Sequence, residues 1–252
     1  MAPARPIHGF RRPSSFGGVP PVTLRLLIAT GLTTLGCVIS AHLGLPQILE
    51  AFVLQPAQVL PGGKAWKLLS YLLFEGLDPL GFLLDLVVLY FFGAWFERTW
   101  GPRRFISFYA LSGLLAGLFV ALIGLVSPAV AVQPYYGIWP VMEALTVAMG
   151  LLEPDMQIYF YFLFPLPARV LMYASWGLIA LFMIFHGSPV PYLTAVGGAL
   201  AGLALSVSRG GPRQLWLRFR AAQIERQLRR RSRHLTVVPP PNGEDDPKRW
   251  LH

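Results

Sequence analysis

Charged residues are scarce in this sequence. Of 252 residues only 13% are Asp, Glu, Lys or Arg, whereas a soluble domain carries about 25%. No such residue lies between Phe105 and Met142, or between Val170 and Ser208, and each stretch is long enough for two membrane spans. With 54% hydrophobic residues and a mean hydropathy of +0.54, the sequence predicts an integral membrane protein and excludes an ordinary soluble domain.

Cysteine is nearly absent as well. The single Cys37 excludes an intrachain disulfide and a Cys-x-x-Cys metal site, so we expect Cys37 to pack in an apolar helix and we predict no metal or cofactor. Residues 1–23 are rich in Pro, Gly and Arg, and no Ala-x-Ala site follows the first apolar run. We therefore expect a disordered N-terminal segment followed by a retained span rather than a cleaved signal peptide.

The apolar runs predict an all-α membrane domain over residues 24–208. Only helices satisfy every backbone group in lipid without closing a barrel, and these runs are too long for barrel strands. We expect the segment 46–78 to dip into the membrane interface and the stretch 156–168, which is too short to span, to be an interfacial connection. The six expected spans are 24–45, 79–96, 104–126, 137–152, 169–186 and 191–208.

Basic residues predict the orientation of these spans. Cytoplasmic loops carry an excess of Lys and Arg. If both termini are cytoplasmic, Lys64 and Lys67 are the only two of the 21 basic residues that face outside. The opposite topology reverses this distribution, so we predict cytoplasmic N- and C-termini.

The sequence becomes polar and strongly basic after Arg209. Apolar residues recur at helical spacing, and nine arginines but one glutamate lie between Arg209 and His234. We predict an amphipathic helix at 209–235 on the anionic inner membrane surface, followed by a disordered tail at 236–252. Nucleic-acid binding is less favoured because no recognition motif accompanies the charge. The expected lipid-contacting residues include Arg218, Arg220, Arg229, Arg230 and Arg231.

The stretch "GFLLDLVVLYFFGAWFERTWGPRRF", residues 81–105, carries a pattern of small and acidic residues. Gly93, Glu97 and Gly101 are spaced by four. This stretch resembles the second helix and following turn of the rhomboid intramembrane serine proteases, which have Gly, Glu and Gly at these spacings. Near a helix end, Glu97 is expected either to accept hydrogen bonds from backbone amides or to pair with an arginine of the turn, and thereby to fix the depth of the span.

Two further stretches carry the resemblance. Trp66-Lys67 is similar to the Trp-Arg pair of the family's first outer loop, and "TAVGGALAG" resembles its last helix through Gly198 and Gly202. Small residues let membrane helices approach closely. The resemblance implies a rhomboid-like six-helix bundle over residues 24–208.

The catalytic residues of that family are missing here. Where the family has Gly-x-Ser-Gly, this sequence reads "GIWP", so that Gly137 matches but Trp139 replaces the nucleophilic serine. Ala195 replaces the histidine base of the last helix. A nucleophile needs an activatable oxygen or sulfur and a base within reach, so we predict that serine endopeptidase activity is lost. We further expect Trp139 to fill the space that substrate and water would occupy.

The oxyanion site is altered too. Gly81 and Asp85 stand where the family has His and Asn, and an ionised Asp85 would repel a developing oxyanion. Asp85 and Glu143 lie within predicted spans, where an ionisable group is costly and is a functional candidate. We favour two neighbouring acids that share a proton and join helices by hydrogen bonds, because the spans offer no basic partner.

The sequence leaves two other functions open. One is an active rhomboid-type endopeptidase with a displaced catalytic pair drawn from Ser127, Ser188 and His186. The other is a transporter that uses Asp85 and Glu143, although no internal repeat supports it.

The favoured hypothesis is an inactive rhomboid-like membrane protein. What the resemblance implies for its partners is binding of transmembrane helices of client proteins, with a role in their quality control, assembly or trafficking. The bilayer and anionic lipid are further expected partners. High Arg, Leu, Gly and Pro usage favours a bacterial inner membrane.

Overall fold

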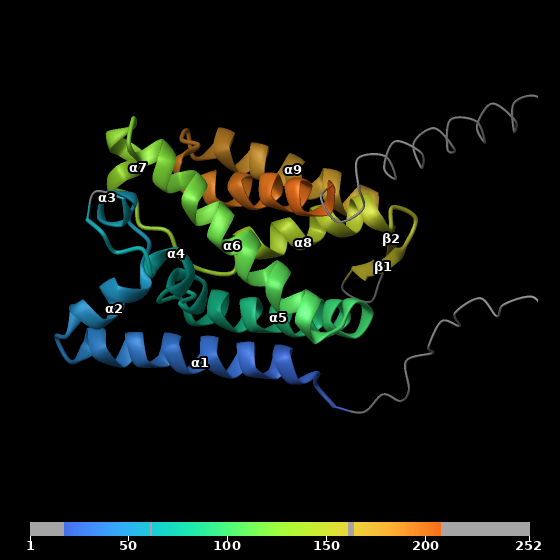
Figure 1. Ribbon diagram of the computed structural model, residues 1–252, viewed down its shortest axis with the longest axis horizontal. Helices are drawn as coiled ribbons and strands as arrows, with labels where there is room; N and C mark the ends of the chain where they lie inside the picture. The colour runs from blue at the N-terminus through green and yellow to red at the C-terminus, as the bar shows by residue number, and fades with distance from the viewer. Residues whose placement is uncertain (1–17, 61, 161–163, 208–252) are drawn as a thin grey trace, which may run out of the picture. The chain divides into compact units, whose positions relative to one another are not determined.

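The structure is a computed structural model that describes residues 18–60, 62–160 and 164–207. Most of these residues are helical (Figure 1). Five helices are long and apolar enough to cross a membrane, and they coincide with five of the six predicted spans. They are α1 (Pro21–His42), α5 (Pro79–Trp100), α6 (Pro102–Gly124), α9 (Ala168–Phe185) and the final helical segment Val190–Val207, which begins with the 3-10 turn η2 (Val190–Tyr192).

The fourth predicted span is a shorter helix. α8 (Trp139–Leu152) has 14 residues, and every residue from Pro140 to Gly150 is buried. It packs against α6 and α9 and runs between them in Figure 1. α8 is therefore enclosed by other helices.

Glycines allow the final helix to pack backbone to backbone against α8. A Cβ added at Gly198 would lie 2.0 Å from the carbonyl oxygen of Pro140, and one at Gly202 would lie 2.6 Å from that of Ala144. No larger side chain fits at either position without moving a helix. The two glycines singled out in the sequence thus lie where small residues are required.

Prolines and one glycine determine where the helices begin and end. α1, α5 and α6 each begin with proline at the first position, where its missing N–H costs nothing. Gly101 has φ +85° and separates α5 from α6. Because glycine adopts this conformation without a Cβ penalty, the chain reverses within one residue.

The helix α1 packs against α5 and against the short helix α2 (Pro46–Phe52). Its buried face is small or polar and includes Cys37, whereas most of its leucines and both of its isoleucines are exposed. This distribution is the reverse of a soluble helix and suits a helix whose outer face meets lipid.

The segment 46–78 folds as a series of short helices. Besides α2 these are α3 (Pro56–Val59), α4 (Lys67–Ser70) and the 3-10 turn η1 (Tyr71–Leu73). Leu54 pairs with Tyr135 in an isolated antiparallel bridge, with both N···O distances 2.9 Å. A further short helix, α7 (Pro128–Val132), follows α6.

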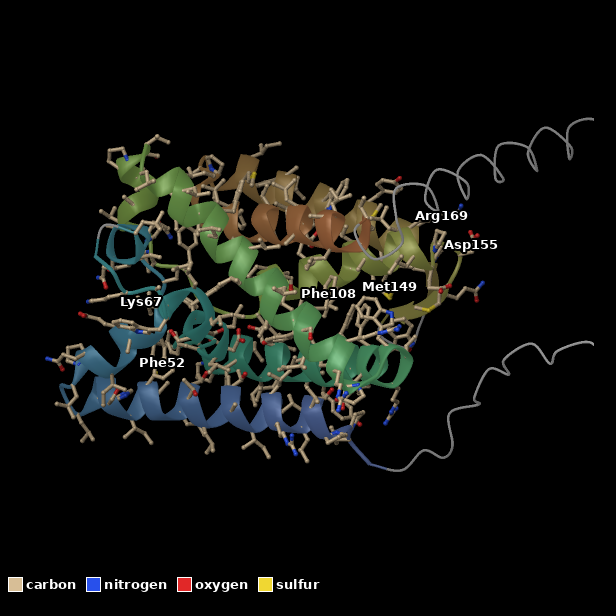
Figure 2. All side chains as sticks on the ribbon, viewed as in Figure 1. Phe52, Lys67, Phe108, Met149, Asp155 and Arg169 are labelled. Atoms are coloured by element: carbon tan, nitrogen blue, oxygen red, sulfur yellow. The ribbon has the colours of Figure 1, made fainter. Side chains whose placement is uncertain are left out.

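The connection at 156–168 contains a β-hairpin, which departs from the predicted all-α fold. β1 (Gln157–Phe160) pairs antiparallel with β2 (Phe164–Pro167). The prediction used only the length of the stretch, whereas its aromatic residues favour strands and pairing satisfies their backbone groups. Beside the hairpin, Arg169 and Asp155 form an exposed ion pair of 3.4 Å (Figure 2).

Several predicted segments lie outside the described residues. They are most of the N-terminal segment 1–23, the basic helix 209–235 and the tail 236–252. The lipid-contacting arginines fall in the second of these. Within the described part, α1 begins at Pro21, slightly before the expected start of the first span.

Candidate functional site

Glu97 joins the end of α5 to the beginning of α1. Its carboxylate accepts hydrogen bonds from the backbone N of Val22 (3.0 Å), the backbone N of Thr23 (2.7 Å) and the Thr23 hydroxyl (2.9 Å). The first amides of a helix have no intrahelical acceptor, and a negative charge is favourable there. Of the two interactions considered for Glu97, the structure has the one with backbone amides.

Gly93, one turn before Glu97, makes room for this contact. A Cβ at Gly93 would lie 3.0 Å from Cγ2 of Thr23. Arg98, next to Glu97, donates to the carbonyl oxygen of Gly18 at 3.0 Å and so also holds the start of α1. The Gly-Glu-Gly pattern therefore serves one junction between two helices.

Lys67 holds the segment between α1 and α5 together. Its side chain is only 1% exposed and lies among the short helices (Figure 2). Nζ donates to the carbonyl oxygens of Glu50 and Val53, the latter at 3.0 Å, and to Oε1 of Gln58 at 2.8 Å. Burial lowers the pKa of Lys67. The neighbouring Trp66 is exposed, so Lys67 alone of this pair is an internal structural residue.

The segment that resembles the protease nucleophile motif carries no nucleophile. Trp139 begins α8 with its side chain 57% exposed, so the expectation that it fills the substrate space is wrong. The exposed position follows from its place at the first residue of the helix, ahead of the buried run that begins at Pro140. Ala195 is buried in the final helix and offers no base.

A carboxylate that the sequence analysis missed lies at this segment. Glu75 is 7% exposed, and its Oε1 and Oε2 lie 3.1 and 3.3 Å from the backbone N of Ile138. Gly137 has φ +93°, and a Cβ there would lie 2.8 Å from Oε2 of Glu75. Gly137 therefore leaves the space that the Glu75 carboxyl group occupies. The sequence feature that could have revealed Glu75 is that it is the single acid in the apolar stretch "YLLFEGL", residues 71–77.

Asp85 is hydrogen-bonded to Glu75, and we call these two residues the carboxyl pair. Burial raises the pKa of Glu75 well above its ordinary value, and the adjacent Asp85 carboxyl raises it further. The sequence analysis paired Asp85 with Glu143, and this prediction is wrong: the partner of Asp85 is Glu75. Gly81 donates its N–H to Oδ2 of Asp78 at 2.7 Å and belongs to the N-terminal cap of α5.

Glu143 has its own partner on the neighbouring helix. Oε1 accepts a hydrogen bond from the hydroxyl of Ser175 in α9 at 3.0 Å. The indole N–H of Trp176 lies beside the same carboxyl group without a direct hydrogen bond. Glu143 therefore joins α8 to α9, as expected for a polar residue that holds helices together in a membrane.

One further polar group lies beside the carboxyl pair. Tyr109 of α6 is 3% exposed, and it interacts electrostatically with Glu75. Its hydroxyl has no hydrogen-bond partner among the described residues. By contrast, the hydroxyl of nearby Tyr71 donates to the carbonyl oxygen of Gly113 at 2.9 Å.

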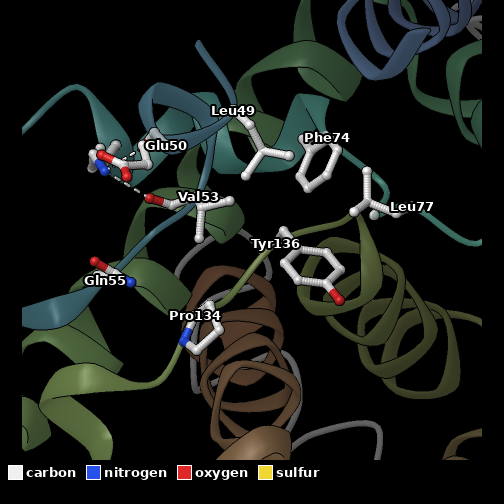
Figure 3. Close-up of a pocket in the computed structure, with 10 residues that line it drawn as sticks. Leu49, Glu50, Val53, Gln55, Phe74, Leu77, Pro134 and Tyr136 are labelled. Carbon is white, nitrogen blue, oxygen red and sulfur yellow. Dashed lines mark hydrogen bonds between the residues drawn. The ribbon is translucent and has the colours of Figure 1, made fainter. Parts of the chain in front are cut away.

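A pocket of about 310 Å³ is lined by Phe74 and Gly76, the two chain neighbours of Glu75, and by residues of the segments around Leu54 and Tyr135 (Figure 3). The bridge between Leu54 and Tyr135 turns those two side chains into the core, so their neighbours in sequence line the pocket on the other face. Phe74 and Tyr136 pack across it with ring centroids 5.3 Å apart. The lining residues are Leu49, Glu50, Val53, Gln55, Lys67, Phe74, Gly76, Leu77, Pro134 and Tyr136.

The displaced catalytic pair is not assembled in the described part of the chain. His186 follows α9, and its Nδ1 contacts the Tyr192 hydroxyl at 2.9 Å and the Phe182 carbonyl oxygen at 3.0 Å. Ser188 accepts a hydrogen bond from the backbone N of Val190, and Ser127 occupies the N-cap position of α7 without a capping hydrogen bond from its side chain. Among the described residues, neither serine hydroxyl forms a hydrogen bond with the His186 imidazole.

These features define a multi-pass helical membrane protein that has kept buried acids and carries no assembled nucleophile in its described residues. Residues 25–206 match a family described as eukaryotic integral membrane protein (DUF1751), and the chain belongs to that family. No curated protein matches the chain. The predicted bacterial inner membrane is therefore wrong, because amino-acid usage reports base composition and membrane insertion rather than the kind of organism.

Proposed function

We propose that this protein is a catalytically inactive, rhomboid-like membrane protein that binds transmembrane helices of other proteins. Its role would be in the quality control, assembly or trafficking of those clients. The bundle would have six spans, with α8 as the short fourth span and both termini cytoplasmic. The segment 209–235 would bind anionic lipid on the cytoplasmic face.

The observation that carries this proposal is the carboxylate of Glu75 at the backbone N of Ile138. Hydrolysis of a peptide needs amide donors that are aimed at a developing negative charge. Here the donor next to the nucleophile position is already engaged by an acid. With Trp139 and Ala195 in place of the serine and the histidine, the site is organised against that chemistry while the helical scaffold is kept.

The proposed helix-binding surface lies along α5 and α9. Both helices expose large apolar residues, among them Leu84 and Val88 of α5 and Tyr173 and Leu181 of α9. The resemblance places a lateral opening between these two helices. The pocket beside Glu75 would take an apolar side chain from the part of a client that leaves the membrane.

The six-span proposal requires α8 to cross a thinned region. Its 14 residues extend about 21 Å at 1.5 Å per residue, less than the roughly 30 Å of a hydrocarbon core. Enclosure by other helices and local thinning would compensate. Because Cys37 is the only native cysteine, Val126→Cys and Asp155→Cys, each in a Cys37→Ala background, should react with an impermeant maleimide from opposite sides of sealed vesicles.

The function is tested by offering the purified protein in lipid a labelled transmembrane helix. Binding without cleavage, and no labelling by a fluorophosphonate, is the expected result, with the Trp139→Ser/Ala195→His variant measured beside it. Absence of binding to any helix would refute the proposal. Fluorophosphonate labelling that is lost in Ser127→Ala or Ser188→Ala would instead favour an active endopeptidase with a displaced pair.

A further inference from the structure

The carboxyl pair differs from the other buried acids because it lacks donors. Glu97 accepts three hydrogen bonds, and Glu143 accepts one from Ser175. Glu75 and Asp85 are hydrogen-bonded to each other, and among the described residues the donor from outside the pair is the backbone N of Ile138. Two carboxyl groups side by side repel when both are ionised, so the pair shares one proton unless a positive charge from elsewhere lets both groups ionise.

The chain does not supply that charge in the part that the structure describes. Among the described residues, the ion pair is the one between Arg169 and Asp155, which lies beside the hairpin β1–β2 (Figure 2). Within α5 the only basic residue is Arg98, thirteen positions beyond Asp85 and bonded to Gly18. An ionisable residue inside a membrane normally pairs with a residue of opposite charge or with backbone groups. Asp85 faces a second acid, so a partner of opposite charge has to come from outside the described residues.

Tyr109 points to the same conclusion independently. Its hydroxyl is almost completely buried beside Glu75 and has no partner in the described chain. A buried polar group without a hydrogen bond is costly. A phenol oxygen and two carboxyl groups together form a set of acceptors, which suits a ligand with several N–H donors.

Asp85 gives access to this set from the membrane. It is half-buried, whereas Leu84 and Val88 beside it are exposed on the face of α5. Asp85 is the seventh residue of α5, which puts it about 9 Å along the helix axis from Pro79. Asp85 therefore lies in the bilayer half nearer to the segment 46–78.

We propose that the carboxyl pair and Tyr109 bind a lysine or arginine side chain carried by the transmembrane helix of a client. The basic residue would lie in the bilayer half nearer to the segment 46–78 and would reach Asp85 along the exposed face of α5. This inference rests on the proposed function and adds the chemistry by which a client is selected. A long basic side chain suits the site because its alkyl stem packs on apolar residues while its charge reaches the acids.

The experiment uses the full chain in nanodiscs and three labelled synthetic helices. Each is a Leu/Ala transmembrane helix that is identical except at one position a quarter of the way across the bilayer, which is Arg, Leu or Glu. We expect the Arg helix to bind roughly tenfold more tightly than the Leu helix, the effect of one or two interhelical hydrogen bonds, and the Glu helix to bind least tightly. This comparison requires only the native protein.

Variants then assign the preference to residues. Asp85→Asn should reduce the ratio between the Arg and Leu helices, and Asp85→Asn/Glu75→Gln should abolish it. Glu143→Gln is the matched control, since it removes an acid from the same bundle that already has a donor, and it should leave the ratio unchanged. Circular dichroism of each variant checks that the helices are retained.

The outcomes separate this inference from the proposed function. Equal binding of all three helices would overturn the inference and leave client binding intact. Binding of none would refute the proposed function itself. A preference for the Arg helix that survives Asp85→Asn/Glu75→Gln would show that another site reads the charge and would also overturn the inference.

Discussion

The two ends of α5 carry buried acids in opposite situations. At its C-terminal end, Glu97 receives two backbone amides and a hydroxyl from the start of α1. Near its N-terminal end, the carboxyl pair receives one backbone amide and lies against an unpartnered tyrosine. Glu97 and Glu75 are both buried, so the difference between them lies in the number of donors.

This difference in donors distinguishes Glu97, which has a structural role, from the carboxyl pair, for which we propose a role in binding. A buried charge with enough donors stabilises the contact it makes, whereas a buried carboxyl pair with few donors destabilises its surroundings until a partner arrives. The same helix thus fixes the bundle at one end and leaves a site for a ligand at the other. Four experiments test this difference.

The largest effect is expected at Glu97. Glu97→Ala leaves three donors without an acceptor, two of them in buried hydrogen bonds, at about 1–3 kcal/mol for each buried unsatisfied group. We expect a loss of about 3 kcal/mol or more in unfolding free energy, measured by SDS titration of the protein in mixed micelles. The exposed Glu153→Ala is the control. A cost similar to that of the control would mean that the junction with α1 is not structural.

The next effect compares two glycines with positive φ. Gly101, at the Glu97 end, has φ +85° and ψ 159°, a region essentially restricted to glycine, and open space around a new Cβ, so Gly101→Ala should cost only backbone strain, about 1–3 kcal/mol. Gly137→Ala adds a contact of 2.8 Å with Glu75 and should cost more. Gly137→Ala/Glu75→Ala should recover part of that excess. Equal costs for the two single variants would contradict the position of Glu75.

The pH dependence of stability should distinguish Glu75 from an ordinary surface acid. Because the folded protein holds the pKa of Glu75 above its ordinary value, stability from this residue is present at low pH and is lost as pH rises through the raised pKa. Glu75→Gln keeps an acceptor for Ile138 and should be more stable than the native protein at pH 8, on the order of 1 kcal/mol.

The advantage of Glu75→Gln should shrink as pH falls toward 4. Thermal unfolding at several pH values measures it, with the exposed Asp155→Asn as the control for general charge effects. An advantage that is independent of pH would show that Glu75 stays protonated, or stays solvated, throughout.

The smallest effect is expected at Trp139. The side chain is exposed, so Trp139→Ala should change the unfolding free energy by less than about 0.5 kcal/mol. Trp100→Ala is the contrast, because Trp100 packs edge-on against Phe96 and Phe108 and its loss should cost about 3 kcal/mol. A large cost at Trp139 would mean that it does fill the vacated site.

Much of the helical architecture could be predicted from local composition. Long stretches without charge marked the helices, and prolines and Gly101 marked where they begin and end. The spacing of Gly93, Glu97 and Gly101 also predicted a structural acid at a helix end, with backbone amides and an arginine of the turn as its two candidate partners. The positions of helices and their ends depend on neighbours within a few turns, whereas the partners of Glu97 are 74 and 75 residues away and only the structure identifies them.

The carboxyl pair could not be predicted in the same way. Glu75 and Ile138 are 63 residues apart in the chain, and no periodic pattern connects them. Asp85 was assigned to Glu143 because both are acids within spans, yet Glu143 meets Ser175 and Asp85 meets Glu75. The hairpin at β1 and β2 was missed because length alone excluded a span without indicating pairing.

Three features follow from the sequence alone: that the chain inserts in a membrane, which residues form most of its helices, and that the serine and histidine of the protease motif are absent. These follow from hydrophobicity, which acts on each segment separately, and from residue identity. The tertiary structure decided which acids are satisfied and which are not. That outcome depends on which donors the packing of α1, α6 and α8 brings to each carboxylate, and hydrogen bonds act only over a few ångströms.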